Sequence, residues 1–120
     1  MSTIVPKVLA QGYMPMSGTS PTGGPEVARG PGTVYLVPAS TTSYVKYFKI
    51  FNVSASFEKA EIFTYVLGVT RSLAVCGLSR SYSADIIDEG SLVLDAGSAI
   101  LLQATNSSSV SYVITGAEEA

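Results

Sequence analysis

The stretch "SLVLDAGSAILLQAT" (residues 91–105) decides the fold class of this chain. Two short apolar runs flank Asp95-Ala96-Gly97, and Asp and Gly are residues that favour turns. Each run is a few residues long and rich in Leu, Val or Ile, which is typical of buried strands. We therefore expect two β-strands hinged at these three residues.

The residues around this stretch repeat the same succession of strand and turn signals. After Pro38 the chain contains no proline, which suits a region whose backbone N–H groups bond to neighbouring strands. Near the end of the sequence, Val110, Tyr112 and Ile114 alternate on one face. About eight short strands with turns between them are typical of a sandwich or a small barrel. The expected strands cover residues 33–38, 43–53, 60–69, 72–78, 83–87, the two runs of 91–105, and 110–116.

The strand expected at 43–53 should be irregular. Lys46 and Lys49 are three residues apart and fall on opposite faces of a regular strand, so we expect a bulge or twist between them. The interior of the sandwich should hold apolar residues from several strands: Phe48, Ile50, Val66, Leu101 and Ile114.

The first 32 residues differ in composition from the rest. Five of the six prolines fall in residues 1–31, and a segment this rich in Gly and Pro cannot fold on its own. We expect an extended N-terminal arm over residues 1–32, followed by a β-sandwich domain over residues 33–120. In a second interpretation, Ile4 to Leu9 form the first strand of the sandwich. The apolar side chains of the arm have no core of their own to join, so we expect them to bind a partner: Ile4, Val5, Val8, Leu9, Tyr13, Met14 and Met16.

The residue types present exclude most enzymatic chemistry. The chain has no histidine and a single cysteine, Cys76, so neither a Ser-His-Asp triad nor an ordinary single-chain zinc site can be built. The acidic run of Asp85, Asp88 and Glu89 fits no EF-hand loop, and we interpret it as a solvated turn between strands. We expect no catalytic residue, no cofactor and no metal.

The charge balance narrows the class of partner. Charged residues make up 13% of the chain, and the net charge is −2. Binding to nucleic acid needs a surplus of Lys and Arg, which this chain lacks. No apolar run approaches the length of a membrane span, so we expect neither nucleic acid nor a membrane as a partner. A low-charge surface suits contact with other protein.

Two longer stretches, "GTVYLVPASTTSYVKYFKIFNVSAS" (32–56) and "DEGSLVLDAGSAILLQATNSSSVSYVITGAEEA" (88–120), resemble a group of small virion proteins of tailed bacteriophages. The resemblance implies a jelly-roll-like β-sandwich of about eight strands and a structural role in a virion. The matching positions are Val37-Pro38-Ala39, Thr41-Thr42, Lys46, Asn52, Leu92 to Leu94, Ala96-Gly97-Ser98 and Gly116-Ala117-Glu118.

Three functional hypotheses follow. In the first, the chain is a capsid decoration (cement) protein on the outer surface of the virion, which clamps neighbouring major capsid subunits and associates with copies of itself as a trimer or dimer. In the second, it belongs to the tail, an adaptor or a fibre. The third is a carbohydrate-binding module with a stacking platform of Tyr35, Tyr44, Tyr47, Tyr82 and Tyr112.

Overall fold

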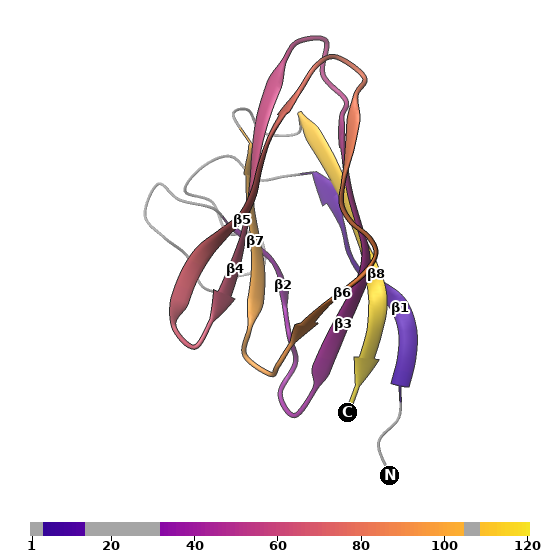
Figure 1. Cartoon of the computed structure of the whole chain (residues 1–120), viewed down its shortest axis with the longest axis vertical. Helices are drawn as coiled ribbons and strands as arrows, with labels where there is room; N and C mark the ends of the chain where they lie inside the picture. The colour runs from indigo at the N-terminus through magenta and orange to yellow at the C-terminus, as the bar shows by residue number, and fades with distance from the viewer. Residues whose placement is uncertain (1–3, 14–31, 105–108) are drawn as a thin grey trace.

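The computed structural model describes residues 4–13, 32–104 and 109–120, with only the backbone at residues 89–91. It contains antiparallel strands and turns (Figure 1). The strands are β1 (Ile4–Tyr13), β2 (Gly32–Leu36), β3 (Thr42–Asn52), β4 (Glu58–Val66), β5 (Val69–Leu78), β6 (Ser83–Leu94), β7 (Ala99–Ala104) and β8 (Val110–Glu119).

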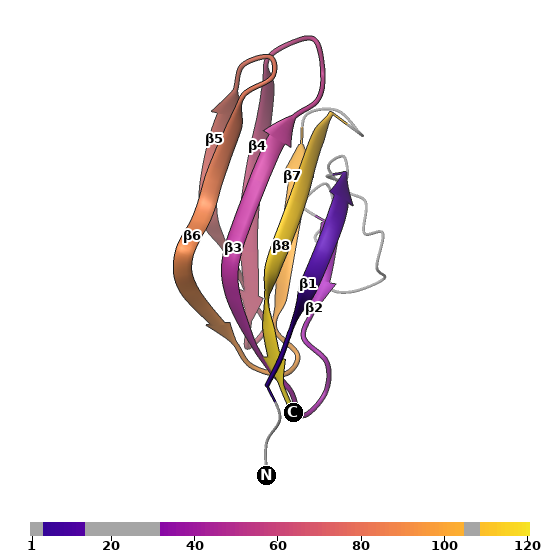
Figure 2. The same ribbon diagram turned by 90° about the vertical axis from the view of Figure 1, so that its right-hand side faces the viewer.

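The strands form two four-stranded sheets packed face to face. Sheet A has the order β1-β8-β3-β6 and sheet B has the order β2-β7-β4-β5. Figure 1 shows the two sheets edge-on, with sheet B on the left and sheet A on the right, and Figure 2 looks onto sheet A. The strand pairing is nested, with the outermost strands of the sequence paired first: β1 pairs with β8, β2 with β7, β3 with β6 and β4 with β5. This double Greek key is the jelly roll, so the predicted fold class is confirmed.

The expected hinge in residues 91–105 is confirmed. β6 ends at Leu94 and β7 begins at Ala99. Between them Gly97 has a φ of 85°, a left-handed conformation that glycine adopts without steric cost. The Gly97 N–H donates to the Val37 carbonyl, and the Val37 N–H donates to the Ser98 carbonyl. These bonds fasten the turn to the segment that follows β2.

The predicted irregularity between Lys46 and Lys49 is also confirmed. The pairing of β3 shifts between Val45 and Tyr47 on both of its neighbours: Lys46 is an extra residue against β8, whereas residues 89–91 of β6 lie against it on the other side. The backbone of β8 lies so close here that a Cβ on Gly116 would overlap the Tyr44 carbonyl oxygen. A glycine is therefore required opposite the bulge.

The start of the sandwich differs from the predicted domain boundary. Ile4–Tyr13 pairs with β8 as the edge strand of sheet A, so the arm predicted for residues 1–32 is wrong over this part, and the second interpretation describes it. The physical reason is that β8 has an open side, and pairing with β1 satisfies its backbone donors and acceptors. Residues 14–31, with Met14 and Met16, lie outside the described residues.

The acidic run does not form the predicted turn. Asp85 and Asp88 belong to β6, which continues without interruption to Leu94. β6 accommodates its polar residues through two irregularities in its pairing with β3, one at Ile86 and one within residues 89–91. Bulges of this kind are common in edge strands, and the first allows Ile86 and Ile87 both to pack against the core.

Most of the predicted core residues are buried, with one exception. Phe48, Ile50 and Ile114 are inaccessible to solvent and lie between the sheets, whereas Val66 is 40% exposed at the end of β4, so its assignment was wrong. Leu101 is 1% exposed. It lies opposite Phe63 and Thr33 and between Ile100 and Leu102 of the core, which places it on the outer face of sheet B.

A buried asparagine ties the ends of two strands together. Asn52, the last residue of β3, donates from Nδ2 to the carbonyls of Ser56 and Leu78. Its Oδ1 accepts from the Ser54 N–H at 2.8 Å. The Asn-x-Ser pattern at this position therefore fixes the β3–β4 loop against the end of β5.

The core assignment predicts a contrast between two substitutions to alanine. Ile50→Ala should lower the free energy of unfolding by about 2–5 kcal/mol, because it leaves a cavity between the sheets. Val66→Ala should cost less than about 1 kcal/mol, because its side chain is partly in water. Urea unfolding of both variants checks this, and equal losses would contradict the assignment.

Candidate interaction surface

Five of the seven side chains predicted to bind a partner belong to β1, and four of these five are exposed. Ile4, Val8 and Tyr13 are exposed, with Tyr13 at 59%. Val5 is also exposed and lies opposite Glu118 at the open edge of the sheet. Leu9 differs, because it is the extra residue where the pairing with β8 shifts, and it packs against the core.

The register of sheet A shows which of these side chains share a surface. Directly paired residues in neighbouring strands project from the same face. One row across the sheet consists of Val8, Thr115, Tyr47 and Asp88, on β1, β8, β3 and β6. The row beside it consists of Gln11, Val113, Lys49 and Asp85, and the next of Tyr13, Ser111, Phe51 and Ser83.

All these rows lie on the outer face of sheet A, because the intervening residues of β3, Phe48 and Ile50, point into the core. This is the broad face toward the viewer in Figure 2. We call its exposed large apolar side chains the apolar face: Ile4, Val8, Tyr13, Tyr47, Phe51, Val93 and Val113.

The charged groups on this surface are few. Asp85 and Asp88 lie on β6, and Lys49 is paired with Asp85 across β3 and β6. At the other end of the face, the Tyr44 hydroxyl donates to Glu119 Oε1 at 2.7 Å, and this bond raises the pKa of Tyr44. The acidic groups thus lie on β6 and at the Glu119 end of the face, and the outward side chains of Ile4–Tyr13 carry no charge.

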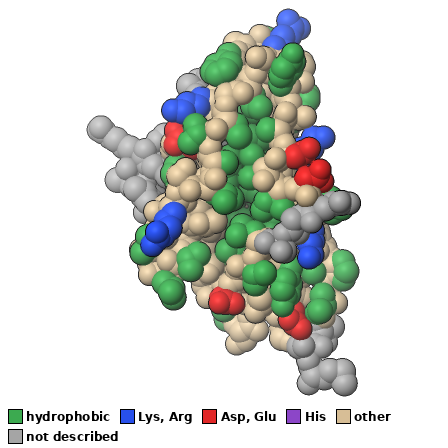
Figure 3. Space-filling view, viewed as in Figure 1, with side chains coloured by type: hydrophobic (Ala, Val, Ile, Leu, Met, Phe, Trp, Pro, Cys, Tyr) green, Lys and Arg blue, Asp and Glu red, His purple; other side chains and the backbone are tan. Residues whose placement is uncertain are grey.

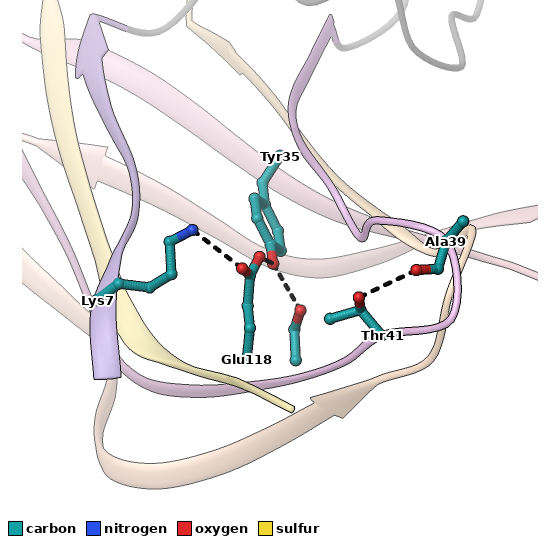
Figure 4. A network of polar contacts seen from close by, with 6 residues as sticks. Lys7, Tyr35, Ala39, Thr41 and Glu118 are labelled. Atoms are coloured by element: carbon teal, nitrogen blue, oxygen red, sulfur yellow. Dashed lines mark hydrogen bonds and ion pairs between the residues drawn. The ribbon is translucent and has the colours of Figure 1, made fainter. Parts of the chain in front are cut away.

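A group of polar side chains holds β1 in place from the inner side. Lys7 Nζ donates to Glu118 Oε1 at 3.0 Å, and the Tyr35 hydroxyl donates to Glu118 Oε2 at 2.5 Å (Figure 4). Because Tyr35 has a single hydroxyl proton, Ser43 Oγ is the donor in the 2.5 Å contact between them. We call these four residues the clasp. They come from β1, β8, β2 and β3, so the clasp joins both sheets.

The clasp shifts the pKa values of its two central groups in opposite directions. The hydrogen bond from Tyr35 is the main cause that lowers the pKa of Glu118, with a further contribution from Lys7, while burial opposes the shift. Burial is the main cause that raises the pKa of Tyr35, and Glu118 adds to it. Glu118 is therefore ionised and Tyr35 neutral across the physiological range.

Groups suited to chemistry are scattered over the described residues. These residues contain no group of three or more His, Cys, Asp or Glu side chains that could hold a metal. Asp85 and Asp88 project into solvent from the outer face, and the side chain of Glu89 lies outside the described part. Cys76 is half-buried, and burial raises the pKa of its thiol, which makes it a poor nucleophile.

The tyrosines considered for a sugar platform do not share one surface. Tyr35 and Tyr112 face the interior, where Tyr112 packs against the core. Tyr44 and Tyr47 lie on the outer face of sheet A, and Tyr82 lies in the turn between β5 and β6.

Sequence reasoning named the β1 part of the apolar face and missed the rest. Tyr47, Phe51, Val93 and Val113 belong to strands that the sequence identified, and alternation with core residues is the signal that places them outside. In β3 that signal is hidden, because Lys46, an extra residue against β8, reverses the alternation midway.

The chain was compared with protein-family models, with curated proteins and with solved structures, and none of the three comparisons gave a match. Among the described residues there is no helix long and apolar enough to cross a bilayer.

The clasp predicts an acid-sensitive contribution to stability. Because folding lowers the pKa of Glu118, its contribution is present above the pKa of the unfolded chain, ~4.3, and is lost as the pH falls through the folded value. Glu118→Gln should cost about 1–3 kcal/mol at pH 7, and its difference from the wild type should shrink on acidification. Urea unfolding as a function of pH measures both.

Lys7→Met is the matched control, because it removes only the exposed ion pair and should cost less than about 1 kcal/mol. A Glu118→Gln variant as stable as the wild type at pH 7 would show that the Tyr35–Glu118 bond contributes no net stability.

Proposed function

We propose that this chain is a structural protein of a tailed-phage virion: a capsid decoration protein that binds across neighbouring major capsid subunits on the outer surface. The observation that carries the proposal is the apolar face, a set of large exposed side chains on one side of a jelly-roll sandwich. These side chains gather on four neighbouring strands, and large exposed apolar groups gathered on one face mark surfaces that contact other protein. The resemblance of residues 32–56 and 88–120 to small virion proteins points in the same direction.

The size of the surface supports a protein partner. Four strands about 4.8 Å apart, each about nine residues long at ~3.3 Å per residue, give a flat area of roughly 550–600 Å². A standard interface buries ~800 Å² on each partner. Side chains that project from the sheet make its accessible surface larger than the flat estimate and bring it toward that value. The outer face of sheet A is therefore large enough to hold one partner firmly.

The arrangement of the surface suggests how attachment works. Tyr13, Tyr47 and Phe51 supply the large, rigid side chains that dominate protein interfaces. Backbone pairing with β8 holds β1 in the sheet, so its apolar side chains are already positioned before contact, and little conformational entropy is lost on binding. Few charges are present, so burial of apolar area is the main source of affinity.

A tail, adaptor or fibre-associated role is the second candidate, because the same rigid sandwich and face suit a ring or a fibre as well as a capsid lattice. The carbohydrate-binding alternative has weaker support, since only Tyr44 and Tyr47 of its five tyrosines share the outer face of sheet A.

The proposal predicts that the apolar face mediates attachment to particles that lack this protein. Tyr47→Ser and Val8→Ser should each weaken binding about tenfold or more, because truncation of an interface anchor costs ~1.4 kcal/mol or more of binding free energy. Leu67→Ser is the control, because Leu67 is 96% exposed at the β4–β5 turn, away from the face. Binding is measured by co-sedimentation of purified protein with stripped particles.

Copy number in purified virions separates the two virion roles. Several hundred copies per particle agree with decoration of the capsid, whereas a dozen or fewer indicate the tail. If Tyr47→Ser and Val8→Ser bound as well as Leu67→Ser, the apolar face would not be the attachment surface.

A further inference from the structure

The four edge strands of the sandwich differ in how they are protected against pairing with another strand. β1 contains Pro6 and an extra residue at Leu9, β2 has five residues, and β6 has two irregularities. Proline, bulges and shortness are all devices that prevent edge-to-edge association. β5 is ten residues long and contains no proline, and from Ala74 to Leu78 its register with β4 is uninterrupted. β5 is therefore the edge best suited to accept a further strand.

The core is incompletely covered along this edge. Figure 3 shows apolar side chains running down the middle of the molecule, between β5 of sheet B and β6 of sheet A. On the side away from β4, β5 has no paired strand among the residues that the structure describes. We use the term open edge for the free side of β5 together with the side chains of β5 and β6 that pack against the core and remain partly exposed: Ala74, Cys76, Ala84, Ile86, Ile87 and Leu92.

The inward side chains of β5 are small where the strand is regular. Ala74 and Cys76 pack against the core, and neither fills the space beside it completely. Neighbouring strands pack side chain against side chain, so small residues on β5 leave room for larger ones on a strand that lies next to it. The shape of the open edge therefore favours an extended segment with large apolar side chains at alternate positions.

The charges at the two ends of β5 are both positive. Arg71 lies opposite Thr64, which lies opposite Ile100 of the core, so Arg71 is on the inner side of sheet B. Arg80 follows β5 in the turn to β6. Both arginines are exposed, and neither is in an ion pair with a residue that the structure describes. A segment that pairs with β5 would therefore meet a positive charge at each end.

Acidic side chains of the neighbouring strands do not neutralise these arginines. Residues 62–84 contain no Asp or Glu. Glu61 of β4 is in an ion pair with Lys59 at 3.5 Å, and Asp85 and Asp88 of β6 project from the outer face of sheet A. A second copy of β5 would place arginine beside arginine, so charge favours an occupant with acidic ends.

We propose that the open edge binds an extended segment of another protein, with large apolar side chains at alternate positions and an acidic residue at each end. The segment would pair with residues 72–78 of β5, which span ~23 Å, and its acidic ends would lie beside Arg71 and Arg80. In complexes of this kind main-chain hydrogen bonds supply affinity and alternate side chains supply specificity. A contact of ~23 Å by roughly 20 Å covers about 450 Å² on each partner, which is the size of a transient interaction.

This inference goes beyond the proposed function and does not rest on it, because it concerns a different surface. Tyr47→Ser on the apolar face should weaken attachment to particles and leave binding at the open edge unchanged. Binding at the open edge is measured on the free protein, without particles. The failure of one proposal is therefore distinguishable from the failure of the other.

The first test uses a synthetic peptide, Glu-Val-Thr-Val-Thr-Val-Thr-Val-Glu, with both termini capped and a fluorescent label. Fluorescence anisotropy should show binding to the wild type in the micromolar range. The same peptide with Lys in place of both Glu should bind about tenfold more weakly or worse, because attraction at each end becomes repulsion. The difference should shrink in ~1 M salt, which screens exposed charges. Absence of binding, or equal binding of the two peptides at low salt, would overturn the proposal.

The second test removes the positive charges of the open edge. Arg71→Gln and Arg80→Gln should each weaken binding of the acidic peptide about two- to fivefold, the contribution of an exposed ion pair. Lys46→Gln is the matched control, because Lys46 is also exposed but lies on β3, an interior strand of sheet A. It should bind as the wild type does. Unchanged binding in both arginine variants, or an equal loss in Lys46→Gln, contradicts the assigned role of the arginines.

The third test asks whether the peptide lies beside β5. Cys76 is the single cysteine of the chain and is partly exposed at the open edge, so its alkylation by iodoacetamide should slow severalfold at saturating peptide. Alternate residues of a strand direct their N–H groups to opposite sides. Methylation of the central valine nitrogen and of a neighbouring threonine nitrogen should therefore have unequal effects on binding. An unchanged alkylation rate, or equal effects of the two methyl groups, would show that the peptide does not pair with β5.

Discussion

The pairing of β1 with β8 is the contact on which the rest of the sandwich depends. Without it, β8 would be the edge of sheet A, and its outer backbone groups would have no strand to bond to. The pairing also brings Lys7 to Glu118, which connects sheet A to Tyr35 of sheet B. The same register places the apolar side chains of β1 beside those of β3 and β8. The stability of sheet A and the position of its apolar face therefore both depend on the pairing of β1 with β8.

The sequence predicted features that are encoded locally. The hinge at Asp95-Ala96-Gly97 has its own turn chemistry, and the bulge at Lys46 follows from the spacing of two lysines within one strand. Features that depend on a distant partner were not predictable in this way. Ile4–Tyr13 has the composition of an arm and becomes a strand only because β8 offers an open side. The acidic run around Asp85 has the composition of a turn and remains in β6 because bulges on an edge strand tolerate it. The apolar face was found only in its β1 part, since the other members are identified by register across three strands.

The outer face of sheet A has a definite physical character as a contact surface. Its backbone groups are already paired within the sheet, so it offers side chains alone and suits a partner of complementary shape. A chain with few charges gains specificity at such a surface from the positions of its large side chains.

The nested order of strand pairing has a consequence for biosynthesis. During translation, β4 and β5 can pair as soon as their hairpin leaves the ribosome, whereas β1 must wait until Val110–Glu119 has emerged, more than a hundred residues later. Long-range pairing of this kind folds slowly, because the loop entropy is lost before the contacts form. Throughout that interval the apolar side chains of β1 are exposed on a nascent chain without a partner strand, which is the period in which such chains aggregate or bind chaperones.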